Sequence, residues 1–160
     1  PFVVVLPSFR GGENAQEGFY AEIERYEIFV KDTLISLTSN YSIDTSRIAI
    51  GGYSRGGDLS WALSLRNPDL FQGTFVFDSV ITYRDDSNMP QLSANGARFF
   101  MLIGDEGNRL SEMRKAVEEL AQNFINHRFE ILPGGSDHND LSMLRSNLMR
   151  GIDYVLFAAE

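Results

Sequence analysis

Residues 48–57 read Ile-Ala-Ile-Gly-Gly-Tyr-Ser-Arg-Gly-Gly, and this stretch carries the clearest structural signal of the chain. It opens on an apolar, β-branched run, which is typical of a buried strand, and residues 58–66 beyond it are compatible with a helix. Between the two, Ser54 is the centre of a Gly-x-Ser-x-Gly turn. The stretch therefore predicts a strand over residues 47–51, then a sharp turn that carries a serine, then a helix.

The rest of the chain alternates in the same way. Apolar runs of strand length lie at residues 2–6, 73–77, 98–103 and 129–132. Apolar residues at three- and four-residue steps predict helices over residues 19–37, 113–124 and 141–155, and residues 79–97 with Pro90 predict a long loop. Near-continuous apolar strands between amphipathic helices predict an α/β fold: a three-layer αβα sandwich around a mostly parallel sheet.

Bulk composition limits the classes of protein. A length of 160 residues suggests one domain over residues 1–160, and the start inside an apolar run suggests a cropped or processed N-terminus. A net charge of −8 disfavours nucleic acid as a partner, and no apolar run reaches the length of a membrane span. The chain has no cysteine and two histidines, which argues against thiolate and multi-histidine metal sites. The lack of cysteine fits any compartment and leans toward a secreted or periplasmic one.

Parallel α/β sheets place their sites beyond the carboxyl ends of the strands. The residues that follow the predicted strands are Ser8 and Phe9, then Ser54, then Asp78, then Asp105 and Glu106, and finally His138. The topology therefore predicts that a hydroxyl, several carboxylates and an imidazole gather at one edge of the sheet.

Ser54 and His138 form a candidate nucleophile and general base. A serine hydroxyl becomes a good nucleophile only when a base takes its proton, and a helix N-terminus favours the negative charge that develops. The alternative interpretation is that Ser54 merely caps the following helix. The other histidine, His127, is predicted at the end of a helix. There its ring would either be a solvated cap or place a positive charge at the negative end of the helix dipole.

A third residue should orient the imidazole, and two backbone N–H groups should bind the oxyanion. The adjacent Asp105 and Glu106 satisfy the chain order serine, acid, histidine, with Asp78 as a further candidate. By position, the N–H of Arg55 supplies one oxyanion donor, and the loop around Ser8 and Phe9 should supply the second.

The sequence resembles an esterase family of α/β-hydrolases that includes feruloyl esterases, enterochelin-type siderophore esterases and related carboxylesterases. The matching segments are residues 3–7, 47–57, 66–71 and 133–138. The resemblance implies Ser54 as nucleophile and His138 as base. It also implies an α/β-hydrolase fold that lacks the usual N-terminal strands.

Two departures from the family pattern concern the acid and the histidine loop. The family often carries its acid as Gly-x-x-Asp. Counted from Gly104, this spacing puts the acid at position 107, which is a glycine here, so we favour Glu106 and place Asp105 next. In the histidine motif, Ser136 and Asp137 intervene after the paired glycines. A serine–histidine dyad is therefore a further alternative.

These residues predict a serine-dependent carboxylic ester hydrolase that works through an acyl-enzyme and needs no metal or organic cofactor. The expected substrate is a small-molecule or carbohydrate-linked ester. An acyltransferase on the same residues is one alternative, and a catalytically silent binding domain of the same fold is another.

Overall fold

A computed structural model describes residues 3–5, 17–105, 109–133 and 142–157 of the chain. Its strands are β1 (Ala49–Tyr53), β2 (Gly73–Phe77), β3 (Arg98–Gly104) and β4 (Asn126–Leu132). Its helices are α1 (Glu17–Asn40), α2 (Arg55–Arg66), α3 (Met89–Ala94), α4 (Arg109–Gln122) and α5 (Ser142–Phe157). The strands form one sheet in the order β1-β2-β3-β4, and every neighbouring pair is parallel.

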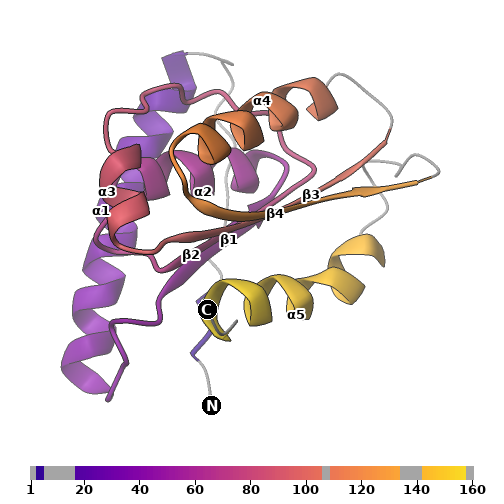
Figure 1. Ribbon diagram of the computed structural model, residues 1–160. Coiled ribbons are helices and arrows are strands. Elements are labelled where there is room, and N and C mark those ends of the chain that lie inside the picture. Colours follow the sequence, from indigo (N-terminus) through magenta and orange to yellow (C-terminus); the bar gives the residue numbers. More distant parts are fainter. Residues whose placement is uncertain (1–2, 6–16, 106–108, 134–141, 158–160) are drawn as a thin grey trace.

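Helices cover both faces of this sheet (Figure 1). On one face α2 packs on β1 and β2, α4 packs on β3 and β4, and α1 lies outside α2, while α5 packs on the opposite face. Alternate residues of β3 enter the two cores: Phe99 and Met101 belong to the larger one under α2 and α4, and Phe100 and Leu102 to the smaller one over α5. The predicted three-layer α/β sandwich with a parallel sheet is confirmed.

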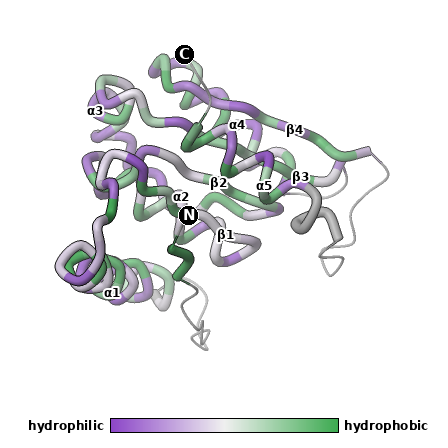
Figure 2. The backbone as a smooth tube through the Cα atoms, turned by 90° about the horizontal axis from the view of Figure 1, so that it is seen from below, coloured by the Kyte–Doolittle hydropathy of each residue, from purple (hydrophilic) through white to green (hydrophobic). Residues whose placement is uncertain are grey.

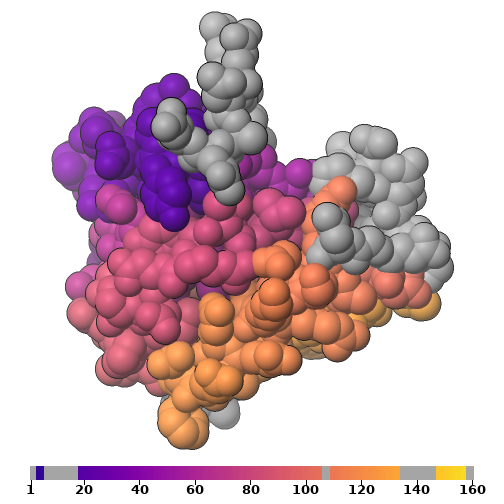
Figure 3. Space-filling model, turned by 90° about the horizontal axis from the view of Figure 1, so that it is seen from above, coloured from indigo at the N-terminus to yellow at the C-terminus, as the bar shows by residue number. Residues whose placement is uncertain are grey.

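The long helix α1 borders this sandwich at the side of β1 and α2. Figure 2 shows that α1 alternates between hydrophobic and hydrophilic residues, and its Phe19 and Ile23 are buried. The segment that links β2 to β3 lies between α1 and α4 on the molecular surface (Figure 3). Within the described ranges, no helix combines the length and the apolar composition that crossing a bilayer requires.

The predicted first strand at residues 2–6 is wrong for the part that the structure describes. Val3, Val4 and Val5 have no strand assignment and are 52%, 69% and 43% exposed. β-Branched residues favour a strand only where a neighbouring strand and a packed face receive them, and no described strand pairs with these three.

Two further expectations need correction. Residues 79–97 are not wholly a loop, because Pro90 is in the first turn of α3, a position where its missing N–H costs nothing. His127 does not end a helix: α4 ends at Gln122, and His127 lies in β4 opposite Phe99 of β3. Pairing with β3 extends β4 over polar residues that the apolar pattern leaves out.

Candidate active site

The carboxyl edge of the sheet brings Ser54, Asp78 and Asp105 to the ends of three adjacent strands. The N–H of each continues the ladder to the next strand: Ser54 donates to the Phe77 carbonyl (2.9 Å), Asp78 to Leu102 (2.8 Å) and Asp105 to Leu132 (3.0 Å). His127 lies near the start of β4 and therefore at the opposite edge. The prediction that Ser54, Asp78 and Asp105 lie together at the carboxyl edge of the sheet is confirmed.

Ser54 has the backbone of a sharp turn between strand and helix. Its φ is 54° and its ψ is −123°, a region that non-glycine residues rarely adopt. Its carbonyl accepts hydrogen bonds from the N–H groups of Gly57 (2.9 Å) and Asp58 (3.1 Å). These are the first hydrogen bonds of α2. The Ser54 side chain makes no capping hydrogen bond, so the alternative of a simple helix-capping serine is wrong. Backbone strain of about 1–3 kcal/mol is typical of a residue held for function.

The glycines around Ser54 play different roles. A Cβ atom on Gly52 would lie 2.3 Å from the carbonyl carbon of Gly56, so strand and helix backbones meet there. A Cβ on Gly57 would lie 2.9 Å from the Cβ of Ser79. A Cβ on Gly56 would meet nothing within 4 Å. The close approach of strand and helix therefore requires glycine at position 52, whereas position 56 has room for a side chain.

Arg55 is the first residue of α2, so its backbone N–H follows the nucleophile candidate as expected. Its guanidinium points to α1, where Nη2 and Nε donate to Oε2 of Glu22 at 2.7 and 2.9 Å. The guanidinium also lies over the ring of Phe19, 4.2 Å from the ring centroid. The Arg55 side chain therefore holds α1 against the sharp turn around Ser54, which we call the elbow. Of Arg55, only the backbone N–H is left as an oxyanion candidate. Ser8 and Phe9 lie outside the described residues.

The candidate acids differ in their surroundings. Asp78 is buried, has a φ of 44°, and accepts a hydrogen bond from Nη1 of Arg109 at 3.0 Å. Asp105 is exposed. Glu106 and His138 lie outside the described residues, so the histidine and the preferred acid remain predictions. Arg109 begins α4, and its pair with Asp78 fastens that helix to the end of β2.

Asp58 is a buried carboxylate that the sequence analysis did not single out. Its side chain is fully buried, and it accepts hydrogen bonds from the N–H (2.7 Å) and the hydroxyl (2.6 Å) of Thr82. Burial raises its pKa, although the Thr82 hydrogen bonds and the positive charges of Arg55 and Arg84 act in the opposite direction. In the sequence, Asp58 is an ordinary acidic residue in the first turn of a predicted helix. Only its contact with Thr82, 24 residues away, shows that it is a buried structural carboxylate.

This raised pKa predicts how Asp58→Asn changes stability with pH. The folded state holds the Asp58 proton more tightly than the unfolded chain does, so the wild type loses stability as pH rises through the folded pKa. Asparagine stays neutral and can still accept from the Thr82 N–H. The variant should therefore gain stability relative to wild type between acidic and neutral pH, by about 1.4 kcal/mol per unit of the upward shift. Urea unfolding of both proteins at several pH values measures this difference, and a difference that falls with pH contradicts the prediction.

A groove of about 560 Å³ lies away from this edge, between α1 and the segment that leaves α2. Its lining includes Leu34 of α1, Ile48 directly before β1 and Leu70 shortly before β2. Of the candidates that the structure describes, neither Ser54 nor Asp78 nor Asp105 lines it. Within the described ranges, no cluster of histidine, aspartate and glutamate has an arrangement suited to a metal ion.

A parallel sheet covered by helices on both faces, with a strained serine between strand and helix, is the arrangement of an α/β-hydrolase. The family model described as Phospholipase/Carboxylesterase matches residues 6–148, and the chain belongs to this family of carboxylesterase-type hydrolases. The esterase resemblance of the sequence is thereby confirmed, whereas the feruloyl or enterochelin subtype stays a prediction. A search of curated protein sequences found no match.

Solved structures share the fold. A Bacillus cereus carboxylesterase is 15% identical with a TM-score of 0.67, over 94% of this chain and 68% of that one. Arabidopsis thaliana SOBER1 is 15% identical with a TM-score of 0.62, over 89% of this chain and 68% of that one. A thermostable esterase is 22% identical with a TM-score of 0.59, over 69% of this chain and 29% of that one. The chain thus spans about two thirds of the length of the first two structures.

Proposed function

We propose that the protein is a serine-dependent carboxylic ester hydrolase in which Ser54 is the nucleophile and His138 the general base. The observation that carries the proposal is the conformation of Ser54, with a φ of 54° at the junction of β1 and α2 and no capping bond. In hydrolases with such a turn, this conformation presents the serine hydroxyl at the end of the sheet, and a helix N-terminus like that of α2 favours negative charge beside it. Membership of a carboxylesterase family supports the same reaction class.

The proposed reaction has two halves. The Ser54 hydroxyl oxygen attacks the ester carbonyl carbon while His138 takes the hydroxyl proton, and the N–H of Arg55 with a donor near Ser8 or Phe9 binds the oxyanion. The tetrahedral intermediate then expels the alcohol, which receives the proton from His138, and leaves an acyl-enzyme on Ser54. Water, activated by His138, attacks this ester and releases the carboxylic acid and the free serine.

The acid that orients His138 is proposed among three carboxylates. Glu106 is preferred and Asp105 is next, because both follow β3, where the family carries this residue. Asp78 is the buried alternative at the end of β2, although its Oδ2 is engaged by Arg109. Glu106→Gln, Asp105→Asn and Asp78→Asn, compared by the rate of ester hydrolysis, separate the three, and a serine–histidine dyad predicts that none of them slows the reaction strongly.

A fluorophosphonate probe tests the nucleophile and the base together. We expect the probe to label the wild-type protein at Ser54, as shown by peptide mapping, because only an activated serine reacts rapidly. His138→Ala should slow labelling by about 10²–10⁴-fold, the usual contribution of a general base. His127→Ala is the matched control and should label at the wild-type rate, because His127 lies at the other edge of the sheet.

The outcomes distinguish the alternatives. Labelling at another residue, or equal effects of the two histidine variants, contradicts the assignment. A folded wild-type protein that neither labels nor hydrolyses short aryl esters is instead a catalytically silent binding domain. Transfer of the acyl group to an added acceptor alcohol in preference to water identifies an acyltransferase.

A further inference from the structure

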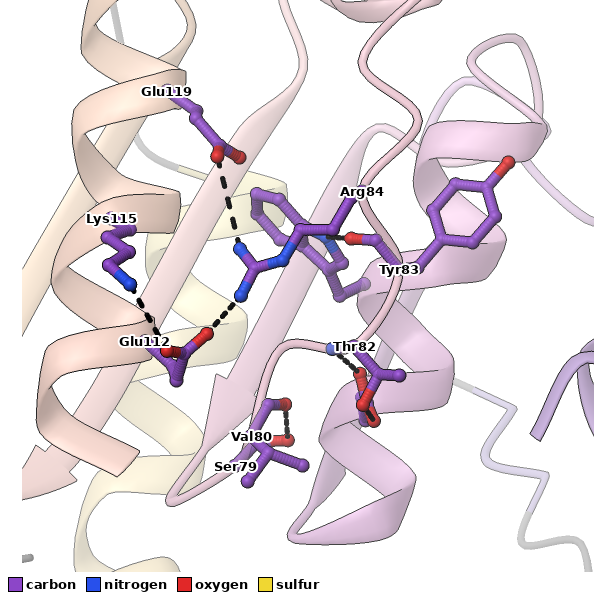
Figure 4. Close-up of polar contacts among 10 residues, drawn as sticks. Ser79, Val80, Thr82, Tyr83, Arg84, Glu112, Lys115 and Glu119 are labelled. Atoms are coloured by element: carbon purple, nitrogen blue, oxygen red, sulfur yellow. Dashed lines mark hydrogen bonds and ion pairs between the residues drawn. The ribbon is translucent and has the colours of Figure 1, made fainter. Parts of the chain in front are cut away.

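Residues 79–84, which follow β2 and which we call the brace, are fastened along one face of α2. The Ser79 hydroxyl shares its one proton between two carbonyl oxygens, that of Ser54 at 2.7 Å and that of Val80 at 2.6 Å (Figure 4 draws the second contact). Thr82 donates twice to Asp58, and the indole N–H of Trp61 donates to the Tyr83 carbonyl at 3.1 Å. Residues 54, 58 and 61 are spaced by four and three, so they share one face of the helix. The brace therefore lies along the helix that the nucleophile candidate begins.

The far end of the brace is attached to α4. Arg84 forms an ion pair with Glu112 and lies 3.9 Å from a carboxylate oxygen of Glu119, and Lys115 in turn contacts Glu112 at 3.4 Å (Figure 4). These side chains are a third or more exposed, so each pair stabilises little by itself. The hydrogen bonds that join the brace to the buried side chains of Asp58 and Trp61 on α2 are thus the stronger attachment.

Contact between the brace and the elbow is close. The Ser54 carbonyl accepts from the N–H groups of Gly57 and Asp58 and from the Ser79 hydroxyl, so the brace supplies the one side-chain donor among these three. Ser79 is fully buried, and only a glycine at position 57 leaves room for its Cβ. A shift of Ser79 would therefore remove a restraint on the ψ angle of Ser54, which is already in a strained region.

Thr82 and Asp58 form the central attachment. Both carboxylate oxygens of the fully buried Asp58 are engaged, one by the Thr82 N–H and one by its hydroxyl. A buried carboxylate that loses a donor carries a desolvation cost, so this pair tolerates little displacement of the brace.

We propose that Thr82 and Asp58 are positioning residues for the nucleophile, because their paired hydrogen bonds hold the brace so that Ser79 fixes the Ser54 carbonyl. The inference rests on the proposed role of Ser54. Misplacement of a reacting group by about 1 Å can reduce the rate about a hundredfold, so a restraint on the elbow backbone should affect the chemical step. It should affect substrate binding much less, since the brace holds the nucleophile rather than the ester.

A second threonine, the buried Thr74 of β2, offers a matched control for the half-buried Thr82. The hydroxyls of Thr74 and Ser64 are 2.6 Å apart, and Ser64 is also on α2, but this contact lies two to three turns beyond Ser54. Thr74 is buried, and Thr→Val removes a hydroxyl hydrogen bond to α2 in both cases at nearly constant volume. The two substitutions differ mainly in their distance from the elbow.

The experiment compares Thr82→Val, Thr82→Ser and Thr74→Val in steady-state hydrolysis of a short aryl ester and in urea unfolding. We expect Thr82→Val to lower kcat by about 10–100-fold with KM changed less than about threefold. Thr82→Ser keeps the hydroxyl and should restore kcat to within about threefold of wild type. Thr74→Val should lose about 1–3 kcal/mol of stability, as Thr82→Val does, yet keep kcat within about threefold.

Ser79→Ala provides a second, smaller change in case Thr82→Val does not fold. It removes the hydroxyl that reaches the Ser54 carbonyl and should lower kcat in the same range without a change in KM. Combined with Thr82→Val, its effect should be less than additive, because both act through the same carbonyl. If Ser54 of the wild type is labelled, either of two results overturns the positioning role: a wild-type kcat in Ser79→Ala, or equal kcat values in Thr82→Val and Thr74→Val. A wild-type protein that neither labels nor hydrolyses overturns the proposed function, and the positioning role with it.

Discussion

Ser54→Ala should lower kcat for a short aryl ester by about 10⁴–10⁶-fold, since removal of the nucleophile leaves only binding and oxyanion stabilisation. The alanine keeps the Cβ and the strained backbone, so the fold should be retained. The kinetic loss should be accompanied by complete loss of fluorophosphonate labelling. Wild-type hydrolysis by the variant contradicts the assignment of Ser54.

Ser54→Gly separates catalysis from backbone strain at the same position. Glycine adopts a φ of 54° without the steric cost of a Cβ. Relative to Ser54→Ala, this variant should therefore be more stable in urea by about 1–3 kcal/mol, the usual strain of such a residue, while being equally inactive. Equal stability of the two variants would show that the turn holds Ser54 without strain.

Gly52→Ala should prevent folding or destabilise the protein by more than about 3 kcal/mol, because its Cβ would lie 2.3 Å from the Gly56 backbone. No flexible side chain is available to move aside, so β1 and α2 would have to separate at the turn that carries Ser54. The measurements are urea unfolding, soluble yield and hydrolysis of the aryl ester.

Gly56→Ala is the matched control for this prediction, since the same motif holds both glycines. Its Cβ would meet nothing within 4 Å, and its φ lies outside the positive range. Alanine is the better helix former, so this variant should be as stable as wild type or more stable by up to about 1 kcal/mol. Similar destabilisation by both substitutions would contradict the assigned roles of the two glycines.

The fold and the core of the site were predictable where the signal is local. Strands over 73–77 and 98–103 match β2 and β3 to within a residue, because buried parallel strands are nearly continuous apolar runs. The ends of these two strands place Asp78 and Asp105 at one edge of the sheet, and the end of β1 places Ser54 beside them. The prediction of a strand at residues 2–6 was wrong for Val3–Val5, because a strand also needs a partner, which composition does not reveal.

The strand–serine–helix turn follows from local sequence alone, since glycine spacing and apolar periodicity act over a few residues and need no distant partner. The surroundings of that turn depend on tertiary packing. It joined Asp58 to Thr82 across 24 residues and Arg55 to Glu22 across 33, and it paired His127 with Phe99 in the sheet. Such contacts depend on which segments packing brings together, so a polar residue seen in the sequence does not disclose its partner.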